Sequence, residues 1–147
     1  MSGRADGLTD EQILAVLDDT RRIAVIGASN NPARPSYGVL RYLAAAGFVV
    51  SAVNPVIAGE DIAGARVYAS LADVPGPIDL VDVFRREDAL PSVTDEVLGS
   101  AESKSIRHLW FQLGLVDERS AERARHAGLT VVMDRCLKME HARFTPS

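Results

Sequence analysis

A short polar segment near the start of the chain has the residue types of a phosphate-binding loop. The apolar run 22–26 is followed at once by Gly27, Ala28, Ser29 and Asn30. An amphipathic helix is predicted from about Ser36, and a helix start and the backbone N–H groups before it attract anions. Gly27 has no Cβ, so the backbone there can approach a phosphate closely. We expect a nucleotide phosphate at this loop; the alternative is a glycine that only closes a tight turn.

The loop departs from the dinucleotide-binding pattern G-x-G-x-x-G, because Ser29 and Pro32 stand where its second and third glycines belong. NAD enzymes also place an acidic residue after the second strand to hold the ribose hydroxyls. Here Asn54 and Pro55 occupy that place. Without a carboxylate, a ribose that carries a phosphate is better tolerated, although Asn54 could simply start a turn. An NAD(P)-dependent oxidoreductase, or another nucleotide-binding enzyme, is therefore the alternative function.

Other residues with binding chemistry follow the same and later apolar segments. Arg34 could pair with a phosphate bidentately, and Ser36 could cap the helix or donate to the same anion. Phe84 could lie beside an adenine ring, and Gln112 is a neutral donor and acceptor. The alternatives are solvated arginines and a core Phe84. The predicted cofactor-binding residues are Gly27, Ala28, Ser29, Asn30, Arg34, Ser36, Tyr37, Asn54, Pro55, Val83, Phe84, Arg85, Gln112 and Gly114.

Residues for catalysis are sparse, and we predict no catalytic residue and no metal site. The three histidines, His108, His126 and His141, have no metal-ligand spacing. Cys136 is a possible reactive thiol, because the neighbouring Arg135 would favour its thiolate form. A quiet, half-buried cysteine is the alternative. We expect no enzymatic turnover.

Composition limits the class of protein. The chain has 147 residues, a formal net charge of −4 and one cysteine. An acidic balance argues against nucleic-acid binding, and a single cysteine is typical of a reducing compartment. The longest apolar stretch, Leu43 to Val50, is too short to cross a membrane, and the charged N-terminus does not resemble a signal peptide. These features predict a cytoplasmic protein without a nucleic-acid or membrane partner.

Apolar segments alternate with amphipathic ones along the whole chain, which predicts an α/β fold. We expect residues 1–7 to be disordered and 8–147 to form one domain, a Rossmann-like, doubly wound, five-stranded parallel sheet. The segment Val56–Gly64 is rich in glycine and is predicted to be a loop. The five predicted strands are Arg22–Ile26, Phe48–Val53, Leu80–Phe84, His108–Phe111 and Leu129–Met133.

Right-handed crossovers favour the strand order 3-2-1-4-5. The order would then reverse between the first and fourth strands, and ligands bind at such a switch point. The loops at that crevice would be Gly27–Asn31 and Gln112–Gly114. The fifth strand, which precedes Cys136, would lie about 10 Å from the first at roughly 4.8 Å per strand.

The chain resembles the stand-alone CoA-binding domain family, related to the CoA-binding domain of the succinyl-CoA synthetase alpha subunit. The resemblance extends from about Thr9 to Phe144. It is carried by Val25-Ile26-Gly27-Ala28-Ser29, Arg34-Pro35-Ser36-Tyr37, Val53-Asn54-Pro55, Val81-Asp82-Val83-Phe84-Arg85-Arg86, Gln112-Leu113-Gly114 and Met133-Asp134-Arg135-Cys136.

The resemblance implies that CoA is the cofactor and lies across the strand ends. Its phosphates would lie at Gly27–Asn30 and near Arg34 and Ser36, and its adenosine by Asn54 and Pro55. The ligand would also pass Val83–Arg85 and Gln112. None of the histidines lies in a glycine-rich loop like that of the phosphorylated histidine in the synthetase, so its ligase activity is not expected here.

The sequence therefore predicts a non-catalytic protein that holds CoA or an acyl-CoA at the carboxyl ends of its strands. A second copy of the chain or an acyl-CoA enzyme is a possible partner. Cys136 could form a mixed disulfide with CoA. A pure interaction module that binds no nucleotide is a third hypothesis.

Overall fold

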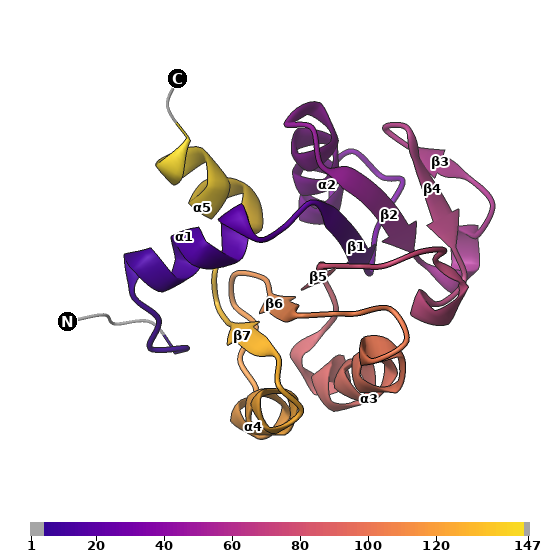
Figure 1. Cartoon of the computed structure of the whole chain (residues 1–147). Coiled ribbons are helices and arrows are strands. Elements are labelled where there is room, and N and C mark those ends of the chain that lie inside the picture. Colours follow the sequence, from indigo (N-terminus) through magenta and orange to yellow (C-terminus); the bar gives the residue numbers. More distant parts are fainter. Residues whose placement is uncertain (1–4, 146–147) are drawn as a thin grey trace.

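The computed structural model describes residues 5–145, which form a seven-stranded sheet with helices on both faces (Figure 1). The sheet has the order β3-β4-β2-β1-β5-β6-β7. All pairs are parallel except β3 with β4. The strands are β1 (Arg22–Ile26), β2 (Val49–Val53), β3 (Asp61–Ile62), β4 (Ala65–Tyr68), β5 (Leu80–Val83), β6 (His108–Phe111) and β7 (Thr130–Val132).

Five α-helices cover the sheet in two layers (Figure 1). They are α1 (Asp10–Asp18), α2 (Pro35–Ala45), α3 (Leu90–Ala101), α4 (Glu118–His126) and α5 (Leu137–Phe144). Apolar residues of α1, α2 and α5 pack on one face, and those of α3 and α4 pack on the other. From Ile23 to Ile26, β1 is therefore apolar at every residue, as expected of a parallel strand buried on both faces. No helix among residues 5–145 is long and apolar enough to span a membrane.

The prediction of a loop over Val56–Gly64 was wrong, because this segment contributes to a hairpin. Asp61 pairs with Arg66 and Ile62 pairs with Ala65 in an antiparallel register. Ala63 and Gly64 connect the two strands with φ values of 50° and 88°. Two consecutive residues with positive φ are the geometry of a tight hairpin turn. The two-residue β3 is too short to show a pattern, and β4 has the exposed Arg66 between the buried Ala65 and Val67, so it lacks the continuous apolar run of the predicted strands.

The hairpin also corrects the predicted strand count and strand order. β4 occupies the outer edge of β2, where the segment 80–84 was expected. That segment instead forms β5 and pairs directly with β1. The order is the expected one with β4 as the third strand, so the error came from the missed strand and not from the handedness rule. The switch point therefore lies between β1 and β5.

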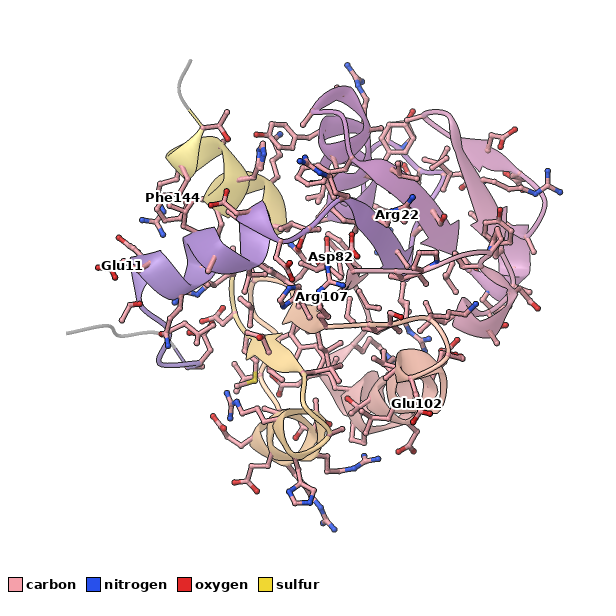
Figure 2. The ribbon with its side chains drawn as sticks, viewed as in Figure 1. Glu11, Arg22, Asp82, Glu102, Arg107 and Phe144 are labelled. Carbon is pink, nitrogen blue, oxygen red and sulfur yellow. The ribbon has the colours of Figure 1, made fainter. Side chains whose placement is uncertain are left out.

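The amino ends of the central strands are held by charged side chains. Asp79, just before β5, accepts hydrogen bonds from the amides of Arg21 and Arg22 at 2.9 and 2.8 Å. Arg107, just before β6, donates to Asp79 at 3.0 Å and to Asp19 at 2.7 Å (Figure 2). This end is therefore closed by ion pairs, which leaves the carboxyl ends of the strands for a ligand.

The predicted disordered segment 1–7 is described only in part. Residues 1–4 lie outside the described residues. The carboxylate of Asp6 accepts hydrogen bonds from Arg135 at 2.9 and 3.0 Å and from the Met133 amide at 3.0 Å. Asp6 is fully buried by these contacts, so the N-terminal segment is fixed against the loop after β7 at this position. The capping box predicted at Thr9 and Gln12 is confirmed and begins α1.

Candidate functional site

A cavity of about 650 Å³ opens at the carboxyl ends of β1, β5 and β6. Gly27 lies at its base with a φ of 84°. A Cβ at this residue would be 2.0 Å from the carbonyl oxygen of Phe84, which leads out of β5. Glycine is therefore required here both by the positive φ and by the close approach of the two chain segments. The cavity is lined by Gly27, Ala28, Ser29, Arg34, Pro35, Ser36, Val39, Asn54, Phe84, Arg85, Arg86, Gln112, Leu113, Leu115, Cys136 and Met139.

Fewer backbone donors are available in the loop after β1 than the sequence suggested. The amides of Gly27 and Ala28 both donate to the carbonyl oxygen of Val53, at 3.0 and 3.4 Å. Among the described residues, the amides of Ser29 and Asn30 have no acceptor. An anion at this loop can therefore receive two backbone hydrogen bonds rather than four.

Asn54 fixes the shape of the same loop. Its Nδ2 donates to the carbonyl oxygen of Ala28 at 2.8 Å, and its Oδ1 accepts from the Val56 amide at 2.9 Å. Both ends of the side-chain amide are thus used within the protein. Asn54 starts a turn, as the alternative interpretation held, and also ties the loop after β2 to the loop after β1.

Three arginines give the cavity a positive wall although the whole chain is acidic. Arg34, Arg85 and Arg86 all line it. Arg86 pairs with Asp88 at 3.4 Å in an exposed position, and neither Arg34 nor Arg85 forms an ion pair with a described residue. Guanidinium groups match phosphate geometry, so this wall can bind a multiply charged phosphate ligand.

Ser36 does not cap α2, which corrects one of its two predicted roles. The helix begins at Pro35 with Arg34 as the N-cap, and no side chain caps it. Ser36 therefore lies within the first turn, where it is buried and lines the cavity. Its hydroxyl makes no hydrogen bond with a described residue and can still donate to a bound anion.

Gln112 and Cys136 lie together on the α5 side of the cavity. Gln112 follows β6, and its Oε1 accepts from the Leu137 amide at 3.2 Å. Cys136 is the N-cap residue of α5 and is half-buried. Cys136 reaches the cavity because α5 crosses back over the sheet. The prediction that β7 lies two strand spacings from β1 was wrong, because β5 and β6 both lie between them.

The expected effect of Arg135 on this thiol is not supported by the geometry. The guanidinium of Arg135 is buried and binds Asp6 and Glu140. Burial opposes its charge, but the hydrogen bonds that Arg135 donates to Asp6 and Glu140 outweigh that effect and raise the pKa of Arg135. Its charge is therefore balanced by two carboxylates and not directed at Cys136.

A smaller cavity of about 480 Å³ continues the site beyond Gly27 and Asn54. It shares Gly27, Asn54 and Arg85 with the larger cavity, so the two form one crevice. Its other lining residues are Ile26, Val53, Pro55, Val56, Ala69, Ser70 and Glu96. The crevice thus extends on both sides of β1, with the arginines near its middle and Cys136 at one end.

The structure brings most of the predicted binding residues to this crevice, but four of them do not line it. Asn30 donates from Nδ2 to Glu60 at 3.0 Å and so turns toward β3. Val83 is fully buried in the core on the α3 and α4 face. Tyr37 packs on the opposite core, and the Gly114 amide donates to Asp134 at 2.7 Å.

Several lining residues were missed as binding residues because they are apolar. Val39, Leu115 and Met139 reach the cavity from α2, the loop after β6 and α5. Their spacing on the helices is the ordinary spacing of core residues, so the sequence has no signal that separates them from the core. Arg86 and Leu113 belonged to motifs quoted for the family resemblance but were not assigned a contact.

Asp82 is a further polar group that the sequence did not single out. It lies in the middle of β5 between Val25 and Trp110, at the centre of the molecule (Figure 2). It is fully buried, and neither carboxylate oxygen has a hydrogen-bond partner among the described residues. Burial raises the pKa of Asp82 well above its usual range, which favours the neutral form of the carboxyl group.

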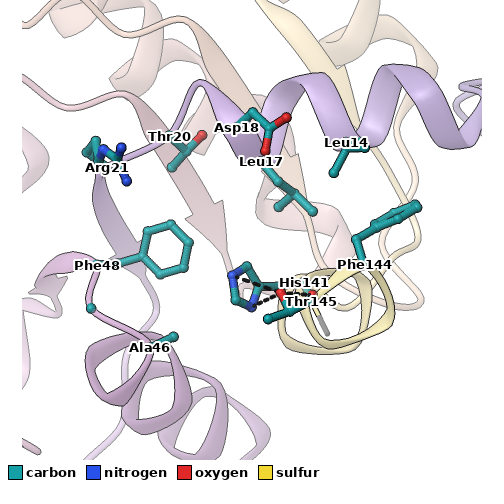
Figure 3. Close-up of a pocket in the computed structure, with 11 residues that line it drawn as sticks. Leu14, Leu17, Asp18, Thr20, Arg21, Ala46, Phe48, His141, Phe144 and Thr145 are labelled. Carbon is teal, nitrogen blue, oxygen red and sulfur yellow. Dashed lines mark hydrogen bonds between the residues drawn. The ribbon is translucent and has the colours of Figure 1, made fainter. Parts of the chain in front are cut away.

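A separate cavity of about 280 Å³ lies between α1, the end of α2 and α5 (Figure 3). His141 stands on its wall next to Phe48, and its Nδ1 is 2.8 Å from the hydroxyl oxygen of Tyr42. The residues that line this cavity include both Asp18 and Arg21, whose opposite charges balance. The cavity therefore lacks the positive wall that the crevice has. No group of three or more metal-ligating side chains is found within residues 5–145.

A family model, the CoA binding domain, matches residues 21–142. The chain belongs to the CoA-binding domain family. The match includes every strand and spans both walls of the crevice. The family resemblance drawn from the loop and strand-end motifs is therefore confirmed.

Two relatives of similar length share this whole domain. The uncharacterized protein YneT of Bacillus subtilis (strain 168) is 38% identical over 131 residues, which are 89% of this chain and 93% of that protein. The structure of cell-free ID.343 from Thermus thermophilus is 38% identical with a TM-score of 0.86, and the match covers 94% of this chain and 100% of that one. Each match thus covers nearly all of this chain and nearly all of the relative.

The same domain fold also occurs within a larger enzyme. The dinucleotide-forming acetyl-coenzyme A synthetase 1 of Ca. Korarchaeum cryptofilum, solved in complex with phosphate and ADP, matches with a TM-score of 0.64 and 25% identity. The match covers 80% of this chain and 26% of the synthetase. The CoA-binding domain fold of this chain therefore corresponds to about a quarter of that synthetase.

Proposed function

We propose that this protein is a cytoplasmic, non-catalytic CoA-binding protein that holds CoA or an acyl-CoA in the crevice at the strand ends. The observation that carries the proposal is the crevice itself. It lies at the switch point between β1 and β5, where Gly27 permits close approach and three arginines face the cavity. Membership of the CoA-binding domain family supports CoA as the ligand.

The charges of the crevice support one placement of CoA. Its phosphates would lie near Ser29, Arg34 and Arg85, where amide, hydroxyl and guanidinium donors meet. The adenosine would extend into the smaller cavity by Asn54 and Pro55, and the pantetheine arm would run toward Cys136. Asn54 stands where dinucleotide enzymes place a carboxylate for the ribose, which suits the 3′-phosphate of CoA better than the free diol of NAD. The carboxylate of Glu96 also lines the smaller cavity, and it accepts a hydrogen bond from the Leu71 amide at 2.8 Å.

Calorimetry and thermal unfolding with CoA, dephospho-CoA and NAD test this function. CoA at about 100 times its dissociation constant should add roughly 2.7 kcal/mol to the free energy of unfolding. Dephospho-CoA should bind more weakly, because it lacks the 3′-phosphate. Tighter binding of NAD than of CoA would instead favour an oxidoreductase. Binding of none of the three would favour the interaction module.

The position of Cys136 supports a thiol reaction with the same ligand. Attack of the Cys136 thiolate on CoA disulfide would form a protein–CoA disulfide and release one CoA thiolate. Intact mass after treatment with CoA disulfide should show the addition of one CoA, and the Cys136→Ser variant should show none. If the wild type never shows the adduct, the proposed reaction of Cys136 is wrong. The proposal that the protein binds CoA does not depend on this result. A partner, whether a second copy or an acyl-CoA enzyme, stays a prediction.

A further inference from the structure

The side-chain amide of Gln112 has a fixed orientation in the crevice. The Leu137 amide can only donate a hydrogen bond, so the atom of Gln112 that faces it at 3.2 Å must be the oxygen, Oε1. The Nε2 group is then the end of the amide that is left for another partner. Gln112 is only 6% exposed and lines the larger cavity, and its Nε2 has no acceptor among residues 5–145. Nε2 is the part of this largely buried side chain that stays accessible from the cavity, so an acceptor of the ligand can reach it directly.

The side chains around this donor are apolar. Val39, Leu113, Leu115 and Met139 line the same end of the cavity, beside the weakly polar thiol of Cys136. Leu113 and Met139 are 60% and 61% exposed, so the rim leaves apolar surface in contact with water. The acceptor of Gln112 is already used by Leu137. This end of the cavity thus offers one strong donor, apolar surface and no strong side-chain acceptor.

Such a site suits the thioester carbonyl of an acyl-CoA better than the amide carbonyls of the pantetheine arm. Each amide of the pantetheine arm has a carbonyl acceptor and also an N–H donor, which would need an acceptor of its own when buried. A thioester has a carbonyl acceptor and no N–H group. Its acyl chain is apolar and would cover Leu113 and Met139.

We infer that the ligand of this crevice is an acyl-CoA thioester whose carbonyl oxygen accepts a hydrogen bond from Gln112 Nε2. The inference rests on the proposed CoA-binding function and deepens it. Gln112 acts here as a specificity residue. Its hydrogen bond to the thioester carbonyl oxygen makes acyl-CoA bind more tightly than free CoA, which has no such oxygen at the sulfur.

Calorimetric binding of acetyl-CoA, the thioether S-ethyl-CoA and free CoA tests the inference. The thioether has nearly the same shape as acetyl-CoA but lacks the carbonyl oxygen. Wild-type protein should bind acetyl-CoA about fivefold to tenfold more tightly than S-ethyl-CoA, which is the effect of about one buried hydrogen bond. The Gln112→Glu variant keeps an oxygen for the Leu137 amide but loses the donor, so this preference should disappear.

A matched control is the Gln12→Glu variant, which makes the same chemical change in the capping box of α1. It should bind all three ligands like the wild type. Equal binding of acetyl-CoA and S-ethyl-CoA by the wild type would overturn the inference, and so would a Gln112→Glu variant that binds all three ligands equally less well. In both cases CoA still binds, so the proposed function survives. Failure of all three ligands on the wild type would overturn the proposed function itself.

Discussion

Asn54 donates a hydrogen bond from its side-chain Nδ2 to the carbonyl oxygen of Ala28 at 2.8 Å, which joins the loops that follow β2 and β1. The residue stands where dinucleotide enzymes place a carboxylate for the ribose. One N–H of its side-chain amide holds the two loops together, so only the second N–H remains for a ligand. The shape of the phosphate loop therefore depends on a residue of the neighbouring strand.

Replacing Asn54 should weaken both the fold and the site. Asn54→Asp removes the donor to Ala28 and sets a carboxylate against a carbonyl oxygen, while the acceptor for the Val56 amide is kept. We expect a loss of about 1–3 kcal/mol in the free energy of unfolding and weaker CoA binding. Chemical denaturation and calorimetry measure the two effects. An Asn54→Asp protein that gained NAD binding would contradict the assignment of Asn54 as a structural link.

Gly27→Ala should lower the free energy of unfolding, whereas the same substitution at Gly38 should not. The new Cβ would lie 2.0 Å from the Phe84 carbonyl oxygen, and the φ of 84° is strained for alanine. We expect a loss of more than about 2 kcal/mol in stability. Gly38→Ala is the control, because Gly38 lies inside α2 with open space around its Cβ position.

Gly38→Ala should raise stability by about 0.5–1 kcal/mol, since alanine favours the helix over glycine. Denaturant unfolding of the two variants, together with CoA titration, compares them. If Gly27→Ala were tolerated with normal CoA binding, the close approach of β1 and β5 would not be what requires glycine.

The arginines of the crevice should govern the salt dependence of CoA binding. Arg34→Gln and Arg85→Gln each remove one charge from the cavity wall and should each lower CoA affinity by roughly tenfold to a hundredfold, the effect of one charge-assisted hydrogen bond. Each should also make binding less sensitive to salt, because one screened attraction is lost. Arg123→Gln on α4 is the control, since Arg123 pairs with Asp95 away from the crevice. CoA affinity is measured from low to high salt in the wild type and the three variants. Equal affinities in all four proteins would show that Arg34 and Arg85 do not bind CoA.

Asp82 should make the protein less stable as the pH rises. Burial raises its folded-state pKa, whereas the unfolded carboxyl titrates near 3.8. Between these two values the folded protein binds a proton that the unfolded chain has released, so stability falls with rising pH. Asp82→Asn removes this titration. The variant should approach the wild type below pH 3.8, where the carboxyl is protonated in both states, and should be more stable than the wild type at pH 7.

Asp79→Asn makes the same substitution at a carboxyl group whose pKa is lowered in the folded protein. The stability contributed by Asp79 should therefore change with pH in the opposite direction. Burial works against ionisation of Asp79, but hydrogen bonds from Arg22 and Arg21 and the charge of Arg107 outweigh it and lower its pKa. Its stabilisation is therefore present above the unfolded pKa near 3.8 and is lost on acidification through the lower folded value. Asp79→Asn should be destabilised at pH 7 and approach the wild type in strong acid. Denaturant unfolding from pH 3 to 8 measures both variants, and parallel curves for Asp82→Asn and wild type would disprove the Asp82 prediction.

The alternation of apolar and amphipathic segments was sufficient to predict the α/β class, the five long strands and the phosphate loop at Gly27. These features are local: a strand buried on both faces is apolar throughout, and a helix start is marked by its residues. The family resemblance followed from the same local motifs, because a loop that must come close to a ligand restricts its own residue types.

Pairing between distant segments was decided by the tertiary structure alone. The hairpin of β3 and β4 has no continuous apolar run, yet β4 occupies the edge of β2 and so β5 lies beside β1. Gln112 acquires one exposed donor only because Leu137 from α5 binds its oxygen. Arg135 faces Asp6 rather than the adjacent Cys136 because packing, and not sequence distance, sets side-chain direction. The sequence by itself therefore determined which elements form and which residues can bind a phosphate, and the fold decided which of them meet.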